Sequence, residues 1–166
     1  MIAYNSDITL RMADEKDLET ILYFIKSIAE FEKLTEEVTT DVEKLRASLF
    51  GKHSNAEAIL AEDGTTAVGF VVFFHNFSTF TGKKGIHLED IFVESEYRNQ
   101  GVGKLLMQKL FEIALERNCE RLDLTALNWN ENALRFYESL GAKPQTEWTA
   151  FRFDKDTLQS LVASKK

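Results

Sequence analysis

Hydrophobic and polar positions in the first part of the chain follow first a strand period and then a helix period. In residues 7–12, DITLRM, apolar side chains occupy every second position, which is typical of a half-buried strand. From residue 18 to 29 they recur at helical spacing, and Asp14 with Asp17 resembles a capping pair before them. We therefore expect one strand followed by a helix that ends near Phe31.

A polar, acidic stretch, EKLTEEVTTD at 32–41, separates this helix from a second, short one. The second helix is expected from about Asp41 to Phe50, with Gly51 closing it. A stretch of this kind between two helices forms either a plain loop or a lid.

The middle of the chain is dominated by strand patterns. Residues 56–74 predict strand, turn and strand, because the Asp63-Gly64 pair is a strong hairpin signal between apolar runs. Residues 75–85, HNFSTFTGKKG, are expected to form a loop. Residues 86–93, IHLEDIFV, predict the next strand, with an apolar run suited to the interior of a sheet.

The last part of the chain alternates between helix and strand signals. The expected elements are a helix from Gly101 to about Asn118, a strand at 121–127, a helix at 131–140, a strand at 148–153, and a final helix from Asp154. This order predicts the α/β class: a three-layer α/β/α sandwich around a mixed, mostly antiparallel sheet.

Composition and charge narrow the classes of function. A chain of 166 residues with 44% hydrophobic residues suits one domain spanning residues 1–166. No apolar run approaches the roughly 20 residues that cross a bilayer, so we expect no membrane partner and a cytoplasmic location.

Cysteine content and charge narrow the possible partners further. The single cysteine, Cys119, excludes an internal disulfide and offers no metal-ligand spacing. A net charge of −7 argues against nucleic acid and suits a cationic partner.

The stretch YRNQGVGKLL, residues 97–106, predicts an anion-binding loop. It is not a nucleotide triphosphatase loop, because Arg98 and Leu105 stand where that loop needs glycine and a hydroxyl residue. It is not a dinucleotide loop either, because Leu106 replaces the third glycine. Gly101 and Gly103 still open a helix, whose free N–H groups can donate hydrogen bonds to an anion such as pyrophosphate.

Two motifs together resemble the GCN5-related N-acetyltransferase (GNAT) family. Arg98, Gly101 and Gly103 fill the pattern of the family's acetyl-CoA loop, and NWNENALRFYESLGA is similar to its later helix. The resemblance implies acetyl-CoA as the acetyl-donor co-substrate and a GNAT-type sandwich. The residues that it places against acetyl-CoA are Ile91, Phe92, Val93, Arg98, Asn99, Gln100, Gly101, Val102, Gly103, Lys104, Asn130 and Tyr137.

Within that family, LEDIFV, WNEN and FYESLGA are similar to the spermidine/spermine and thialysine acetyltransferase branch. The resemblance implies a small cationic amine as substrate and a two-fold homodimer in which late strands cross between subunits. The chain departs from the branch in STFTGKKG, where Lys83 and Lys84 could repel a long polycation such as spermidine. The expected amine-binding residues are Phe31, Glu32, Phe80, Glu89, Asp90 and Trp129.

Acetyl transfer to an amine requires a neutral nitrogen, a polarised thioester carbonyl and a proton for the departing thiolate. Family precedent places the carbonyl on backbone N–H groups near Phe92 and Val93, and such donors often supply about 3 kcal/mol. The resemblance makes Tyr137 the acid, since a phenol with a pKa of about 10 stays protonated.

Two adjacent carboxylates are the candidates for handling the amine proton. A regular strand would point Glu89 and Asp90 to opposite faces, with Glu89 beside Ile91, and we favour Glu89 as the base, acting through water. Both carboxylates could instead only bind the cation. His87 could share the face of Glu89 and relay a proton.

Two other functions fit the same residues. One is acetylation of a protein N-terminus or lysine side chain, and the other is a non-catalytic acyl-CoA-binding regulatory domain. An intact loop and Tyr137 favour catalysis over binding alone.

Overall fold

The computed structural model describes residues 7–164, and their contacts divide the chain into two compact units, residues 1–125 and 126–166. The first unit is built around one five-stranded sheet in the order β1-β2-β3-β4-β5. All neighbours are antiparallel except β4 and β5, which are parallel and joined through a helix, so the mixed, mostly antiparallel sheet is confirmed. The strands are β1 (Ile8–Met12), β2 (Glu57–Asp63), β3 (Thr66–Ser78), β4 (Lys83–Val93) and β5 (Leu122–Leu124).

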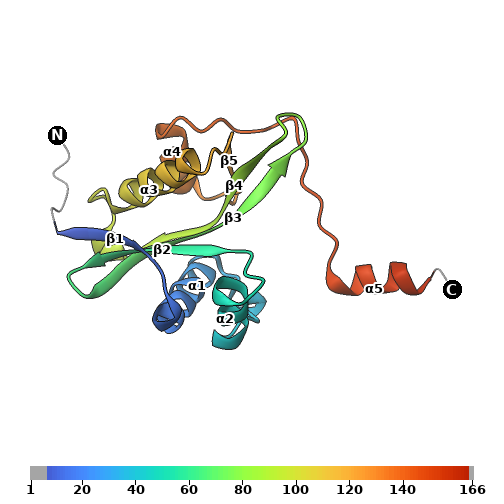
Figure 1. Cartoon of the computed structure of the whole chain (residues 1–166), viewed down its shortest axis with the longest axis horizontal. Coiled ribbons are helices and arrows are strands. Elements are labelled where there is room, and N and C mark those ends of the chain that lie inside the picture. Colours follow the sequence, from blue (N-terminus) through green and yellow to red (C-terminus); the bar gives the residue numbers. More distant parts are fainter. Residues whose placement is uncertain (1–6, 165–166) are drawn as a thin grey trace. The chain divides into compact units, whose positions relative to one another are not determined.

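Helices cover both faces of this sheet (Figure 1). Phe70 of β3 packs in one core cluster with residues of α1 (Leu18–Glu32) and α2 (Val42–Phe50). A side chain at the neighbouring Gly69 would lie 3.4 Å from Leu106 of α3 (Val102–Glu116), on the opposite face. The first unit is therefore the three-layer α/β/α sandwich that the pattern predicts. No helix within residues 7–164 is long and apolar enough to span a bilayer.

Aromatic rings fill the layer between α1 and the sheet. Phe24 of α1 stacks on Phe70 at 5.0 Å between centroids and tilts against Phe92 of β4 at 5.7 Å. Burying one such ring stabilises the fold by about 2–3 kcal/mol. The helical spacing of the apolar residues in α1 thus has its expected cause, because these residues pack α1 against β3 and β4.

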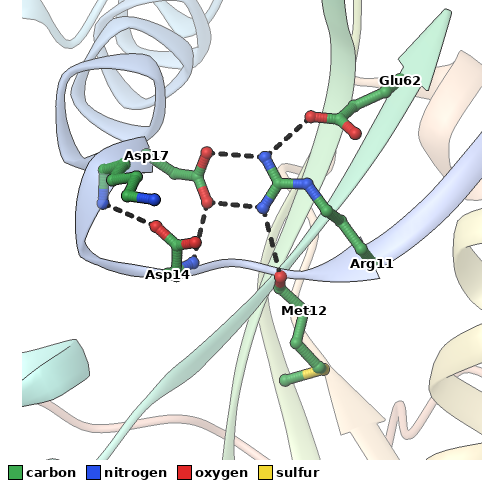
Figure 2. A network of polar contacts seen from close by, with 6 residues as sticks. Arg11, Met12, Asp14, Asp17 and Glu62 are labelled. Carbon is green, nitrogen blue, oxygen red and sulfur yellow. Dashed lines mark hydrogen bonds and ion pairs between the residues drawn. The ribbon is translucent and has the colours of Figure 1, made fainter. Parts of the chain in front are cut away.

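An ionic network fixes the start of α1 (Figure 2). Arg11 of β1 donates two hydrogen bonds of 2.7 Å to the carboxylate of the buried Asp17, and a third of 2.7 Å to Glu62 of β2. Asp17 also accepts the backbone N–H of Asp14, whose own carboxylate caps the short 3-10 turn Glu15–Asp17. The expected capping pair is confirmed, and its second carboxylate ties α1 to two strands.

The β3–β4 hairpin is longer than the sequence pattern predicts. Residues 75–85 were expected to form a loop, but β3 runs to Ser78 and β4 begins at Lys83, with Gly82 at a φ of 66° in the turn between them. Ten cross-strand pairs support this ribbon, so pairing with a neighbour overrides the polar composition of the segment.

The second unit contains α4 (Glu131–Ser139) and α5 (Lys155–Ala163), each capped at its start by a side chain, Asn130 and Asp154 respectively. The strand expected at 148–153 is wrong for the single chain: these residues form neither strand nor helix. A strand needs a hydrogen-bonded neighbour, and residues 126–164 contain no strand to pair with. The segment leaves three aromatic side chains mostly exposed: Trp148, Phe151 and Phe153.

Candidate active site

A β-bulge in β4 shapes the candidate site. Val72 of β3 pairs with Asp90, while the next residue, Phe73, pairs with Leu88, so Glu89 is an extra residue in β4. Val72 and Phe74 lie two positions apart and share a face of the sheet, and therefore so do their partners, Asp90 and His87. The strict alternation expected around Glu89 is therefore wrong, because the bulge shifts it by one residue.

The bulge brings His87 and Glu89 together. His87 Nε2 lies 3.8 Å from Glu89 Oε2, and the imidazole packs on the ring of Phe74 with 4.9 Å between centroids. The Glu89 side chain is 57% exposed and that of His87 is 22% exposed. A partly exposed carboxylate beside an imidazole is a suitable pair for moving a proton toward solvent.

Asp90 lies on the face of the sheet that α1 covers, in the same row as Val72. Burial raises its pKa to about 6, and the negative charges of Glu89 and Glu32 contribute to the rise. Glu32 is the last residue of α1, and burial raises the pKa of its carboxyl as well. Asp90, Glu32 and Glu89 form what we call the acidic cluster, which favours binding of a cation because the ionised form of Asp90 is destabilised by burial and by the charges of Glu89 and Glu32.

The glycine loop ends in a helix start that is free to bind an anion. Gly101 is the N-cap of α3 with a φ of 87°, and Asn99 also has a positive φ, of 61°. The first N–H bonded within the helix is that of Leu105, which donates to Gly101 O, so the earlier N–H groups point out of the helix end. Val102 is buried and anchors this end, while Lys104 is exposed beside it.

The loop before the helix is held by a hydrogen bond of its own, since the side chain of Gln100 donates to Glu96 O at 2.5 Å. The N–H groups, the helix dipole and the lysine fit a pyrophosphate.

Arg98, at the start of the loop, reaches across the end of β4. Its Nε donates to Val93 O at 2.8 Å. Its guanidinium carbon lies 5.2 Å from the ring centroid of Phe92 and 5.7 Å from that of Phe31. One side chain of the loop therefore joins β4 to the last turn of α1.

The edge of β4 beyond the bulge offers backbone donors. Glu94 N–H donates to Val68 O on β3, and since amides alternate along a strand, those of Val93 and Ile91 point away from β3. On that side, β5 pairs with β4 over Ile86–Leu88 and extends no further as a strand among residues 7–164. The N–H groups of Ile91 and Val93 thus lie where the sheet opens, next to the acidic cluster.

The other expected site residues lie elsewhere. Phe80 is in the hairpin turn and 94% exposed, and the six residue steps from Lys83 to Glu89 span about 20 Å of strand. Lys83 forms an ion pair of 2.8 Å with Glu120 at that end. The first unit therefore brings Phe31, Glu32, Glu89 and Asp90 together without Phe80.

Three expected residues belong to the second unit: Trp129, Asn130 and Tyr137. Trp129 is 56% exposed, and Asn130 Oδ1 accepts the N–H of Ala133 as the cap of α4. Tyr137 lies inside α4, where its ring tilts against Phe136 at 5.4 Å. Its backbone carbonyl accepts the N–H groups of Leu140 and Ala142 at the helix end.

The chain is similar to known acetyltransferases over nearly all of its length. A family model described as "Acetyltransferase (GNAT) family" matches residues 20–142. A thialysine N-epsilon-acetyltransferase of Sus scrofa is 36% identical over 168 residues, covering 95% of this chain and 98% of the relative. An L-ornithine N5-acetyltransferase of Arabidopsis thaliana is 40% identical over 93 residues, 56% of this chain and 41% of the relative. The solved structure of an integron cassette protein of V. cholerae has a TM-score of 0.78 at 28% identity, covering 95% of this chain and 99% of that one.

Proposed function

Because the chain belongs to the acetyltransferase (GNAT) family, we propose that it transfers the acetyl group of acetyl-CoA to the primary amine of a small diamine, polyamine or lysine-like amino acid such as thialysine. The observation that carries this proposal is the acidic cluster. Burial and two negative neighbours raise the pKa of Asp90, so an ammonium group bound there would relieve a repulsion that the fold maintains. The names of the relatives agree, since thialysine and ornithine both carry a side-chain amine.

The donor side of the site is the glycine loop with the open edge of β4. Gly101, Val102, Gly103 and Lys104 would hold the pyrophosphate through the first N–H groups of α3, with Asn99 and Gln100 shaping the approach. The N–H of Val93, aided by that of Ile91, would donate a hydrogen bond to the thioester carbonyl oxygen and stabilise the charge that develops there. Acetyl-CoA supplies an activated acyl group, so transfer needs no covalent enzyme intermediate.

On the amine side, Asp90 and Glu32 would hold the ammonium and Phe31 would cover its apolar part. Glu89 would accept the amine proton through water, with His87 at 3.8 Å passing it toward solvent. The lone pair of the neutral nitrogen then attacks the thioester carbon, the carbon–sulfur bond breaks, and the nitrogen loses its second proton to solvent along the same water path. On the family resemblance, Tyr137 would protonate the thiolate, Asn130 would contact acetyl-CoA, and Trp129 would line the apolar part of the amine pocket.

We also propose that the chain works as a homodimer and as one acetyltransferase domain. The GNAT match runs from residue 20 to 142 and so includes parts of both compact units. Trp148, Phe151 and Phe153 are exposed in the segment whose sequence pattern predicts a strand and which finds no strand to pair with among residues 126–164. Pairing with a second copy would bury these rings. Light scattering tests this: a dimer that Phe151→Lys converts to monomer supports the proposal, and a monomeric native chain contradicts it.

Thiol release from acetyl-CoA tests the activity directly. The panel holds thialysine, ornithine, lysine, putrescine, spermidine and a few peptides, and mass spectrometry identifies the acetylated product. We expect turnover with short diamines and lysine-like amines, with little for spermidine, and Tyr137→Phe should lower kcat by about 10²-fold. Turnover with peptides alone would make the chain a protein acetyltransferase. Acetyl-CoA binding without any turnover would make it a binding domain.

A further inference from the structure

The side chain of Arg98 has contacts that a phosphate-binding residue does not need. Its Nε donates a hydrogen bond to Val93 O at 2.8 Å, and its guanidinium carbon lies over two aromatic rings, 5.2 Å from the centroid of Phe92 and 5.7 Å from that of Phe31. The ring of Phe92 also packs against that of Phe24 of α1, with 5.7 Å between the ring centroids. Arg98 thus acts as a wedge between β4 and α1, since a cation over an aromatic face attracts both rings.

This wedge connects the two halves of the proposed site. On the loop side, the backbone that orients the anion-binding N–H groups starts at Arg98 and passes through the left-handed Asn99 to Gly101. On the α1 side, Phe31 is followed by Glu32, a member of the acidic cluster. Phe31 is 46% exposed, and the helix ends two residues later, where Lys33 has a φ of 59°. The guanidinium of Arg98 is therefore a contact that holds the last turn of α1 against β4.

We propose that Arg98 is a positioning residue that couples the donor and acceptor sites: ordering of the glycine loop around coenzyme A tightens the last turn of α1 and forms the wall of the amine pocket. Coupling of this kind is reciprocal, so the amine must also strengthen coenzyme A binding by the same factor. The inference rests on the proposed function only for the identity of the amine.

A direct bond from Arg98 to the pyrophosphate is the competing role, and it makes opposite predictions. That bond would require Nε to leave Val93 O or the guanidinium to leave the two rings. Removing it would weaken coenzyme A binding strongly and leave α1 unaffected. Removing a wedge would leave coenzyme A binding nearly intact and uncouple α1.

Hydrogen exchange of the native chain with coenzyme A as the probe distinguishes the two roles. In the native protein we expect coenzyme A to slow exchange at least about threefold both in the loop, residues 99–104, and in the last turn of α1, residues 29–34. In Arg98→Met, which keeps an apolar stem without charge, protection of the loop should persist and that of residues 29–34 should disappear. Arg98→Lys should restore part of it, because an ammonium still attracts the rings.

Two further variants serve as controls. Lys104→Met removes a charge from the same loop, so it should weaken coenzyme A binding while both segments remain protected at saturation. Phe31→Leu removes one ring of the wedge at an exposed position and should behave like Arg98→Met. In activity assays with thialysine, Arg98→Met should raise KM for the amine about tenfold, while the Kd of coenzyme A measured without amine should change less than about threefold.

Three results would overturn the proposal. One is an unprotected α1 end in the native chain with coenzyme A bound. Another is a loss of coenzyme A affinity of tenfold or more in Arg98→Met with α1 still protected. The third is an unchanged α1 response in Phe31→Leu. The exchange measurement needs no amine, so absence of thialysine turnover would contradict the proposed substrate without deciding this coupling.

Discussion

The two ends of α1 carry similar carboxylates in opposite electrostatic situations. At its start, Asp17 accepts two hydrogen bonds from Arg11, which hold the pKa of that carboxyl below its usual value. Beside its end, burial raises the pKa of Asp90 on β4 to about 6, and the negative charges of Glu89 and Glu32 add to the rise. The first cluster, Asp17 and Glu62, contains its own cation in Arg11, whereas the acidic cluster suits the binding of an added cation.

The helix itself makes this difference larger. Its dipole favours negative charge at the start, where Asp17 stands, and opposes it at the end, where Glu32 stands without a basic residue in the last turn. The first arrangement stabilises the fold, whereas the second costs stability. A feature that costs stability persists where a ligand uses it, which is why we assign function to the end of α1.

The largest expected effect is on catalysis at the second cluster. Asp90→Asn should lower kcat/KM for thialysine about 100-fold, because one partner of the bound ammonium is lost. Steady-state kinetics at pH 8 measures this. Glu30→Gln is the matched control, since it removes one exposed carboxylate from the same helix, and it should change kcat/KM less than about twofold. Equal losses in both variants would mean that the cluster acts only through net charge.

The next effect is on stability at the first cluster. Asp17→Asn should lower the free energy of unfolding by about 2 kcal/mol, because Arg11 loses its two-bond partner and the start of α1 is weakened. Since the pKa of Asp17 is lowered by folding, this loss is complete above about pH 4 and shrinks as the pH falls further. Urea unfolding at pH 7 and pH 3 tests it. An unchanged midpoint at pH 7 would contradict the structural role of the network.

A smaller effect of opposite sign is expected when Asp90→Asn is unfolded. Because folding raises the pKa of Asp90, its ionised form destabilises the protein above about pH 6, and the penalty vanishes below about pH 4. The variant should therefore be about 1–2 kcal/mol more stable than the native chain at pH 8, and equal to it at pH 4. Urea midpoints at the two pH values measure the difference. A less stable variant at pH 8 would show that Asp90 has a structural partner.

The smallest effect separates the buried network from ordinary surface charge at the same helix end. Glu15 forms an ion pair of 2.7 Å with Arg46, but both side chains are well exposed. Glu15→Gln should change the free energy of unfolding by less than about 0.5 kcal/mol, because solvent screens such pairs. Thermal unfolding beside Asp17→Asn gives the comparison. A loss as large as that of Asp17→Asn would mean that charge at the helix start, rather than Arg11, stabilises this end.

Local patterns predicted those parts of the fold that local physics decides. The capping by Asp14 and Asp17, the Asp63-Gly64 hairpin and the helix that opens at Gly101 each depend on neighbours within a few residues. The segment at 148–153 fails for the opposite reason, since a strand exists only with a partner that the local sequence does not name.

The geometry of the acidic cluster was missed although the sequence contains a signal for it. Fully apolar positions fall on Ile86 and Leu88 before Glu89, but on Ile91 and Val93 after it, so the alternation changes phase at this residue. That phase shift is the signature of the bulge, and it places Asp90 on the face of α1. The contacts of Arg98 have no such signal in the sequence. Phe31 lies 67 positions away from Arg98, so no local pattern could indicate that the two side chains meet.

The most direct test of the acidic cluster is the pKa of the Asp90 carboxyl, measured by carbon NMR in the free protein and with saturating thialysine. We expect the Asp90 carboxyl to have a pKa of about 6 in the free protein. When the ammonium of thialysine binds, this pKa should fall clearly, because the ionised carboxylate gains a counter-ion. A pKa that does not move with the amine bound would contradict the assignment of this cluster as the amine site.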